Sequence, residues 1–418
     1  MLAGARPDGG VVADMLQRGS NLPRVGDYNE VLVMDLIRRH PGISRIELAE
    51  RTGLSGQTVL NICRRLIGKN LINQIGQIRS GAGGRRLAYQ VVPDGRYAIG
   101  VDIDPARTVL IAVNLAGEVI DRMPLRMDDH SDIDQIVAGI DRATRDHLSR
   151  GRRGTLSGLG VALPRAATAR CDPADRQQTR AGWNADELRD SLRSRLRIPV
   201  RIGPDAVAAA TAELWAGTID SQNFAFIYLG ASVGAGVALG GEILRGETDN
   251  LGRLDHLGGD PNGPVCACGG RGCIGAVAEP SHLVVRARDL GLLNGTDPDD
   301  PVSTAAGIVE LGRLAEYGDS AAAEVLDYAA RTYGRAAATL AGLLDLDTIV
   351  FGGPNWPPLE PAFRRIVPQT IEALVGAGAP EVTMRSTTLG GEVGSIGAAS
   401  LLLAETAGPF VAHLVLPA

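Results

Sequence analysis

The sequence predicts an α/β protein in which a small N-terminal unit of helices and a hairpin precedes two larger α/β lobes. Two strand-and-helix runs indicate the lobes: three strands and a helix begin near Tyr97, and a similar alternation begins near Phe224. Of the 418 residues, 44% are hydrophobic, 4% are aromatic and 54 are glycines, which is typical of a globular chain with many tight turns. At roughly 100–200 residues per domain, this length allows two to four domains.

The first part of the chain has the pattern of a tail followed by three helices. Residues 1–22 are Gly-rich without periodicity, and we expect a flexible tail. Apolar spacing predicts a helix over Asn29–Arg39. A capping box at Ser44–Glu47 starts a second helix, Arg45–Arg51. After a Gly-containing turn, Ser55 caps a third helix over Gly56–Gly68, and two helices joined by such a turn make a helix-turn-helix.

A basic hairpin follows the helices. Leu71–Val92 alternates apolar and polar residues around a turn rich in glycine and arginine. Arginines at its tip suit contacts to phosphates or to the minor groove. Helices and hairpin together predict a winged helix-turn-helix DNA-binding domain over residues 23–93.

The second helix of such a unit places its N-terminal side chains on base edges in the major groove. Gln57 and Asn61 can each make two hydrogen bonds to adenine, and Thr58 can touch a thymine methyl. Residues 1–95 carry 13 lysines and arginines against 8 acidic residues, whereas the remainder carries 29 against 40. This asymmetry favours a polyanionic partner for the N-terminus, although a helical bundle with a solvated basic face, or a protein-binding wing, is the alternative. The candidate DNA contacts are Ser55, Gln57, Thr58, Asn61, Arg64, Arg79, Arg85 and Arg86.

A turn at Pro93-Asp94-Gly95 separates this unit from a two-lobed α/β domain over residues 96–418, whose ligand would lie in the cleft between the lobes. The N-terminus lacks a secretory signal and no segment suits a membrane span, so we expect a cytoplasmic protein. Strands are predicted at 97–101, 109–114, 118–124, 158–163, 200–202, 224–239 and 347–353, and helices at 133–148, 186–196, 206–217, 317–344, 359–374 and 396–405.

Three of the five cysteines lie within eight residues, which indicates a metal site and not a disulfide framework. Cys266, Cys268 and Cys273 with His256 would make a tetrahedral zinc site in a loop over residues 256–273. All four positions are filled by the protein, so the site should be structural. The alternatives are reduced free thiols and, for His256, an ordinary loop histidine. Cys63 is expected in a core and Cys171 as a free thiol.

At this point the chain resembles the ROK proteins (repressor, open reading frame, kinase) from about Val25 to Ala407. The resemblance lies in the glycine-rich run from Leu229 to Gly241, in Asn250–His256 and in the Cys-x-Cys-Gly-x-x-Gly-Cys block. It implies an actin-like, sugar-kinase-like fold with two lobes. Members with an N-terminal winged helix-turn-helix are similar to regulators of carbohydrate genes, and those without it are mostly sugar kinases. The zinc ligands of the family match the four residues named above.

One departure from the family concerns the phosphate-binding loop. Kinases of the family have Asp-x-Gly-Gly-Thr-Lys after the first strand, where this chain has Asp102-Ile103-Asp104-Pro105-Ala106-Arg107. Asp104 adds a negative charge where phosphate would lie, and Pro105 removes an amide donor. We therefore expect that phosphate binding is lost and that the protein is not an enzyme, although Gly352-Gly353 and Gly390-Gly391 remain at later nucleotide-lobe positions.

The sugar site implied by the resemblance is also altered. Asp205, the general base in the family kinases, is kept, and we expect it to be vestigial as a base or to contact a ligand. The glutamate before the zinc histidine is replaced by Arg253, and a second by Gly275, while the segment Gln178–Trp183 lacks the usual asparagine. Arg253 would favour a sugar phosphate or a sugar acid, or would simply pair with Asp255. The candidate effector-binding residues are Asp205, Arg253 and His256.

These observations predict a sequence-specific DNA-binding regulator of carbohydrate-related genes, most simply a repressor, with a degenerate kinase-like effector domain. Its partners would be double-stranded operator DNA and a second copy of itself, in a dimer or tetramer, with a structural Zn²⁺ as cofactor. The alternatives are a sugar kinase that retained a DNA-binding arm and a regulator without a small-molecule ligand.

Overall fold

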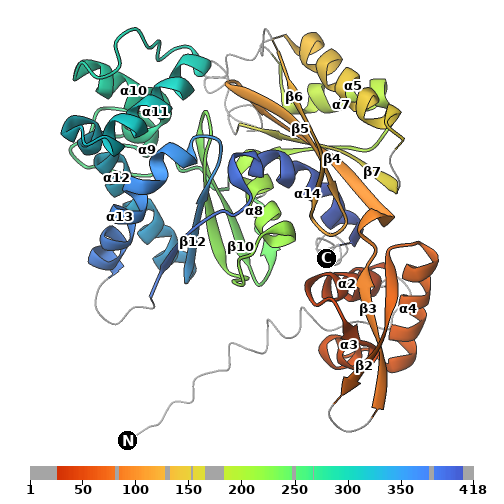
Figure 1. The fold of residues 1–418 in the computed structure, drawn as a ribbon. Helices are drawn as coiled ribbons and strands as arrows, with labels where there is room; N and C mark the ends of the chain where they lie inside the picture. The colour runs from red at the N-terminus through yellow and green to blue at the C-terminus, as the bar shows by residue number, and fades with distance from the viewer. Residues whose placement is uncertain are drawn as a thin grey trace, which may run out of the picture.

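The computed structural model describes residues 26–80, 84–127, 132–151, 154–164, 183–246, 251–266, 268–375 and 381–407. These residues form a small domain and two lobes, each of the three built around its own sheet (Figure 1). The tail at 1–22, Cys171 and the segment from Gln178 to Gly182 lie outside the described residues.

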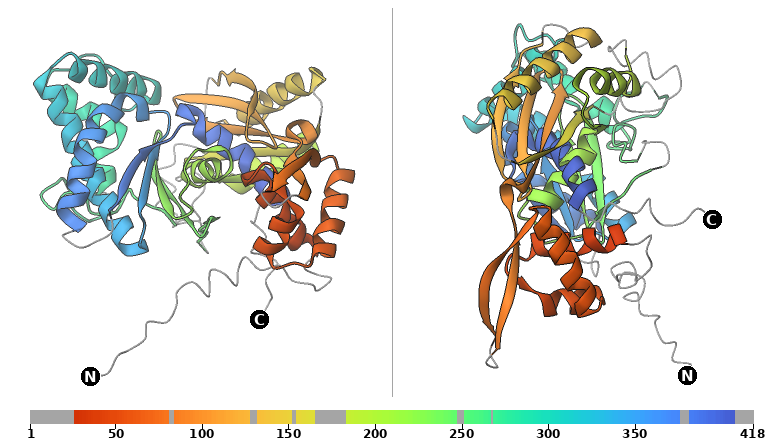
Figure 2. Two further views of the ribbon diagram at one scale, coloured as in Figure 1. Left: turned by 60° about the horizontal axis from the view of Figure 1, so that its bottom comes forward. Right: turned by 90° about the vertical axis from the view of Figure 1, so that its right-hand side faces the viewer.

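The N-terminal domain is a winged helix-turn-helix, as predicted. It consists of α2 (Gly26–Arg39), β1 (Ile43–Ser44), α3 (Arg45–Thr52), α4 (Gly56–Gly68), β2 (Ile72–Ser80) and β3 (Gly84–Val91), with sheet order β1-β3-β2. The capping box is present: Ser44 Oγ accepts from the Glu47 amide at 3.3 Å, and Glu47 Oε2 accepts from the Ser44 amide at 2.9 Å. Buried Ile37, Leu48 and Ile62 bring the three helices together, while the β2–β3 hairpin projects away from the lobes (Figure 2).

The first lobe is a mixed sheet with two helices on one face. The sheet has the order β6-β5-β4-β7-β8, in which β4, β5 and β6 are antiparallel while β7 and β8 run parallel to β4. Its elements are β4 (Arg96–Asp104), β5 (Arg107–Asn114), β6 (Val119–Leu125), α5 (Ile133–Ser149), β7 (Thr155–Leu163), α7 (Ala185–Leu196) and β8 (Val200–Pro204).

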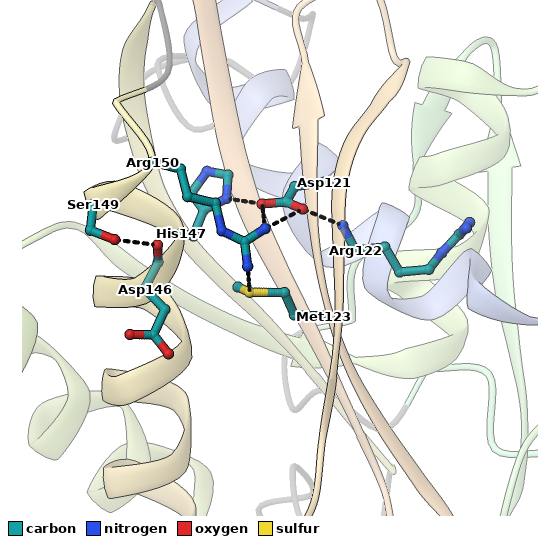
Figure 3. Close-up of polar contacts among 7 residues, drawn as sticks. All are labelled: Asp121, Arg122, Met123, Asp146, His147, Ser149 and Arg150. Carbon is teal, nitrogen blue, oxygen red and sulfur yellow. Dashed lines mark hydrogen bonds and ion pairs between the residues drawn. The ribbon is translucent and has the colours of Figure 1, made fainter.

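A buried histidine fastens α5 to β6 (Figure 3). The His147 side chain is fully buried and its Nδ1 lies 2.7 Å from Asp121 Oδ2. Because an ionised carboxylate can only accept, Nδ1 carries the proton in this pair. Arg150 Nη1 donates to both oxygens of Asp121 at 3.0 Å, and its Nη2 lies 3.2 Å from Met123 Sδ. This network ties α5 to β6, which is the edge strand of the sheet.

The second lobe has a five-stranded sheet of order β11-β10-β9-β12-β13 covered by helices on the outside (Figure 1). Its strands are β9 (Phe224–Leu229), β10 (Val233–Leu239), β11 (Glu242–Ile243), β12 (Thr348–Gly352) and β13 (Thr383–Ser386), and its helices are α9 (Ile274–Ala278), α10 (Pro280–Asp289), α11 (Pro301–Glu316), α12 (Ser320–Leu344) and α13 (Trp356–Val375).

Sequence reasoning placed the start of one helix of this lobe wrongly and missed three others. The helix expected to begin at Tyr317 begins at Ser320, because Asp319 caps it by accepting from the amides of Ala321 and Ala322 at 3.0 Å. Helices α9, α10 and α11 were not predicted.

Two helices fill the space between the lobes: α8 (Asp205–Ala216) and α14 (Val393–Ala407). They pack closely on each other, and α14 also lies against β4 and β7. Glycines permit this approach, since a Cβ at Gly160 would lie 1.8 Å from the Ala398 carbonyl oxygen, and one at Gly397 would lie 1.9 Å from that of Ala208. Among the described residues, no helix is both long and apolar enough to cross a membrane.

Candidate DNA interface, metal cluster and interlobe cleft

Helix α4 presents an exposed polar face opposite its buried face. Gln57, Asn61 and Arg64 are exposed and follow one another at helical spacing, whereas Val59, Ile62, Cys63 and Leu66 are buried. Gln57 Nε2 donates to Asn61 Oδ1 at 3.2 Å, which links the two amides. The exposed face therefore carries donors and acceptors suited to base edges.

Two of the predicted contact residues also shape the N-terminus of this helix. Ser55 Oγ accepts from the Thr58 amide at 3.1 Å and lies 2.8 Å from Thr58 Oγ1. The serine thus satisfies one of the free amides of the first turn. Ser55 is exposed and Thr58 is half-buried, so the first turn also remains accessible.

Near the tip of the wing, the β2–β3 hairpin, the structure describes the backbone of the two strands but not the side chains. Arg79 pairs with Arg85 across the hairpin, and Arg86 pairs with Ile78. The side chains of these three arginines lie outside the described part of the structure, so their contacts to DNA stay a prediction.

The predicted metal ligands come together. One ligand atom from each of His256, Cys266, Cys268 and Cys273 lies within 4.8 Å of the other three. Cys268 and Cys273 Sγ are 3.6 Å apart, and Cys266 Sγ lies 3.5 Å from His256 Nδ1. A tetrahedral ion with Zn–S bonds of about 2.3 Å needs sulfurs roughly 3.8 Å apart, so the cluster has the size that zinc requires.

The local backbone explains how the cluster forms. The Cys266 amide donates to the Gly270 carbonyl at 2.8 Å, and the Gly270 amide lies 3.4 Å from Cys268 Sγ, where it lowers the pKa of that thiol. Gly272 has a φ of 63°, and a Cβ there would lie 1.5 Å from the Asp260 carbonyl oxygen. Only glycine fits at this position, and the turn brings Cys273 back to the other ligands.

The turn between β4 and β5 contacts the second lobe. Asp104 Oδ1 accepts from the Ala106 amide and Oδ2 accepts from the Ala231 amide, both at 2.8 Å. Ala231 belongs to the glycine-rich β9–β10 turn of the second lobe. The Ala231 amide, which is of the kind that can bind an anion, thus already donates to the carboxylate of Asp104.

A second acidic residue of β4 also reaches across the interface. Tyr228 on β9 donates its hydroxyl to Asp102 Oδ2 at 2.7 Å, and both residues are buried. Burial, with a smaller contribution from Asp104, raises the pKa of Asp102 to about 7. Arg107 and Arg122 both pair with Glu392 beside a small cavity lined by Asp102, Arg107, Val109, Pro354, Gly391, Glu392 and Ser395.

The predicted effector residues surround the start of β10. Asp205 begins α8, is buried and accepts from the Ala206 amide at 2.6 Å. Arg253 forms a β-bridge with Gly234, and a Cβ on Gly234 would lie 3.9 Å from Asp205 Oδ1. Asp205 and Arg253 therefore flank the same short segment of β10.

Arg253 makes the pairing that was weighed as the alternative to ligand binding. Its Nε and Nη2 donate to the two oxygens of Asp255 at 3.3 and 3.0 Å. His256 Nε2 lies 3.3 Å from Asp255 Oδ2, so this histidine is shared between the metal cluster and the carboxylate. A Cβ on Gly275 would lie 2.9 Å from the Asp255 carbonyl oxygen, which leaves little room for the glutamate of the family kinases.

Sequence reasoning missed one acidic residue beside Asp255. Glu279 precedes α10, and its side chain accepts a hydrogen bond from the backbone at Val233 instead of capping the helix. Burial and the neighbouring Asp255 raise its pKa to about 7. The sequence signal that could have identified Glu279 is its position as a single acidic residue directly after the apolar run Ile274–Ala278.

Comparisons with known proteins agree with this architecture. Residues 98–405 match the family model described as "ROK family", and residues 27–73 match "Winged helix-turn-helix DNA-binding". The chain is 28% identical over 342 residues to the DNA-binding transcriptional dual regulator NagC of Escherichia coli, covering 80% of this chain and 82% of that protein. It is 27% identical over 312 residues to a glucokinase of Halalkalibacterium halodurans, covering 72% and 93%. Among solved structures, a ROK family transcriptional regulator described as a homologue of the E. coli MLC protein superposes with a TM-score of 0.72 at 20% identity, over 92% of this chain and 98% of that one.

Proposed function

The chain belongs to the ROK family, and from this membership we propose that it is a sequence-specific DNA-binding repressor of carbohydrate genes that responds to a sugar-related effector. The observation that carries the proposal is the exposed face of the capped helix α4, with Gln57 and Asn61 on it. The same chain also contains the two-lobed domain, so DNA binding and effector binding can be combined in one protein. The relatives named as regulators support it, because the match to NagC includes most of both chains.

We infer that Gln57, Thr58 and Asn61 read base edges, while Ser55, Arg64 and the wing residues Arg79, Arg85 and Arg86 contact the backbone or the minor groove. The hydrogen bond between the two amides fixes their relative orientation before DNA is met. Two copies of the chain would bind an inverted repeat, with half-sites about one helical turn apart or at a multiple of that spacing.

We propose a structural zinc ion on His256, Cys266, Cys268 and Cys273. Three thiolates and an imidazole at the spacing described above are a preferred donor set for zinc. The four residues leave no position for substrate, so the ion would hold the loop and not take part in a reaction. Asp255, which lies against the other ring nitrogen of His256, would orient that ligand.

We propose that the protein is not a kinase. Asp104 already occupies the Ala231 amide, and a nucleotide phosphate near this carboxylate would meet a like charge. Without a bound nucleotide there would be no phosphoryl group for a sugar hydroxyl to attack, so Asp205 would not act as a general base. Its role would be to contact a ligand. The match to a glucokinase makes ATP turnover with a panel of hexoses the test of this negative statement. Turnover with any of these sugars would refute it.

The effector is proposed to bind beside Asp205, Arg253 and His256. A sugar hydroxyl can donate to the carboxylates of this cleft. A sugar phosphate or sugar acid would have to displace Asp255 from Arg253 before it could use the guanidinium. Among the three classes of ligand, the paired arginine therefore favours a sugar without an added charge.

Selection of duplexes from a random pool tests the main proposal. The wild type should enrich one palindromic sequence, and Gln57→Ala should relax the preference at one symmetric position by about 1–3 kcal/mol of discrimination. Gln369→Ala, an exposed glutamine on α13, is the matched control and should enrich the wild-type sequence. Enrichment of no sequence by the wild type would contradict sequence-specific binding.

A further inference from the structure

Helix α2 of the DNA-binding domain is fastened to α8 by one buried arginine. Arg38 Nη1 donates to the Trp215 carbonyl oxygen at 2.6 Å, and Nη2 donates to that of Leu214 at 3.4 Å. The guanidinium carbon also lies 4.2 Å from the centroid of the Trp215 ring. Nη2 donates as well to Asp35 Oδ1 at 2.8 Å, so the charge is paired within its own helix.

This contact is specific because its members are buried. The side chains of Arg38 and Asp35 are 8% and 9% exposed, and burial lowers the pKa of Arg38. Burying a guanidinium is costly unless its donors find acceptors, and two of the acceptors of Nη1 and Nη2 belong to the last turn of α8, whereas Nε is buried without a hydrogen-bond partner in the described structure. A cation at a helix C-terminus is also favoured by the helix dipole. The domain is therefore held at one position on α8.

The other end of α8 lies in the proposed effector site. Asp205 is its first residue, and Trp215 lies ten residues further on, so a rise of about 1.5 Å per residue places the Arg38 contact roughly 15 Å away. Between the two ends, α8 lies close to α14: a Cβ on Gly397 would lie 1.9 Å from the Ala208 carbonyl oxygen. Glu213, in the last turn, accepts from Thr387 of the second lobe. The helix therefore has one end at Asp205 and the other at the Arg38 contact.

We propose that α8, with Arg38 as the positioning residue, transmits the state of the interlobe cleft to the DNA-binding domain. This rests on the proposed function, because it assumes an operator and an effector. A ligand at Asp205 would shift α8, and the carbonyls of Leu214 and Trp215 would move α2 with it. Buried apolar residues of α2, α8 and α14 form one continuous cluster that includes Val33, Met34, Ile37, Trp215, Leu402 and Leu403. Such packing is not directional, so the arginine would set the angle at which the domain sits.

Linkage makes the proposal testable before the effector is known. If an effector changes operator affinity, then operator binding must change effector affinity by the same factor, and the relay predicts that α8 responds to the operator as well. The experiment is hydrogen exchange of the full-length protein with and without the selected operator duplex. In the wild type, amide exchange in Asp205–Ala210 should change by at least about fivefold, the lower end of usual coupling. In Arg38→Met the change should be absent, while the operator still protects α4.

Two further variants keep the result decisive. Arg65→Met removes an arginine that pairs with Glu30 inside the DNA-binding domain, and it should keep the wild-type response of α8. If Arg38→Met does not fold, Arg38→Lys keeps the charge but cannot reach both carbonyls while stacked on Trp215, and it should lose most of the response.

Each outcome of the experiment decides between the two proposals. Operator binding without any change in the exchange of α8 would overturn the relay and leave the proposed function standing. A full wild-type response in a folded Arg38 variant would overturn it too. Failure of the wild type to bind any duplex specifically would overturn the proposed function and the relay with it.

Discussion

Replacing Asp102 should make the protein more stable at neutral pH, by an amount that grows as pH rises. Asp102 is 6% exposed, and burial raises its pKa from 3.8 to about 7. A carboxyl whose pKa is raised in the folded state binds more protons when folded than when unfolded. Its contribution to stability is therefore complete below pH 3.8 and is lost as pH rises through about 7.

The difference between 3.8 and about 7 corresponds to about 4 kcal/mol, at about 1.4 kcal/mol for each pH unit. The side-chain amide of the variant Asp102→Asn cannot ionise, and its oxygen can still accept from the Tyr228 hydroxyl, so the variant should avoid this loss. Urea unfolding at half-unit steps from pH 4 to pH 8 measures the effect. The free energy of unfolding of Asp102→Asn minus that of the wild type should rise by about 4 kcal/mol across this range.

Asp134→Asn, which removes an exposed carboxylate on α5, is the control for the loss of one charge. Acidic residues elsewhere titrate equally in variant and wild type and cancel in the difference. A difference between Asp102→Asn and wild type that stays constant from pH 4 to pH 8 would refute the reasoning.

Three other substitutions test the packing, the metal cluster and the wing. Gly160→Ala would place a Cβ 1.8 Å from a backbone oxygen of α14 and should lower the free energy of unfolding by about 3 kcal/mol or more. Gly139→Ala is the control, since its Cβ would have its nearest neighbour at 3.8 Å, and it should be neutral or stabilising in urea unfolding. Equal effects of the two variants would contradict the close packing. Cys268→Ser should abolish the one zinc per chain expected by elemental analysis of the wild type, and an unchanged metal content would remove Cys268 from the ligands. Arg85→Ala should reduce the slope of log affinity against log salt by about 0.9 if this arginine meets one phosphate, and an unchanged slope would exclude that contact.

Local signals explain why some elements were predicted from the sequence. Helix α4 has the predicted bounds because Ser55 caps one end and Gly68 ends the apolar periodicity. The capping box at Ser44 is equally local, since both of its hydrogen bonds join residues three apart. Neither the short helix α9 nor the neighbouring α10 is capped by a side-chain hydrogen bond, and the one local start signal of α10 is the proline at its first position. Their position depends on burial against α12.

The candidate sites divide in the same way. The clustering of the four candidate metal ligands was predicted because their residue types and spacing are informative without a structure. The contact of Arg38 with Trp215 joins residues 177 positions apart and has no sequence signature. Pro105 led to the expectation that phosphate binding is lost, but only the tertiary structure shows that Asp104 accepts from the amide of Ala231. The pairing of Arg253 with Asp255 could be weighed from the sequence, since the two are close along the chain, but not decided.

The most direct test of the account is a footprint of the purified protein on the region upstream of its own gene, repeated across a salt series and with a panel of sugars. We expect a protected inverted repeat that persists at salt concentrations where other fragments are released. Gln57→Ala or Asn61→Ala should weaken the protection, and one sugar should reverse it. Binding that falls with salt equally on every fragment, without a preferred sequence, would contradict it.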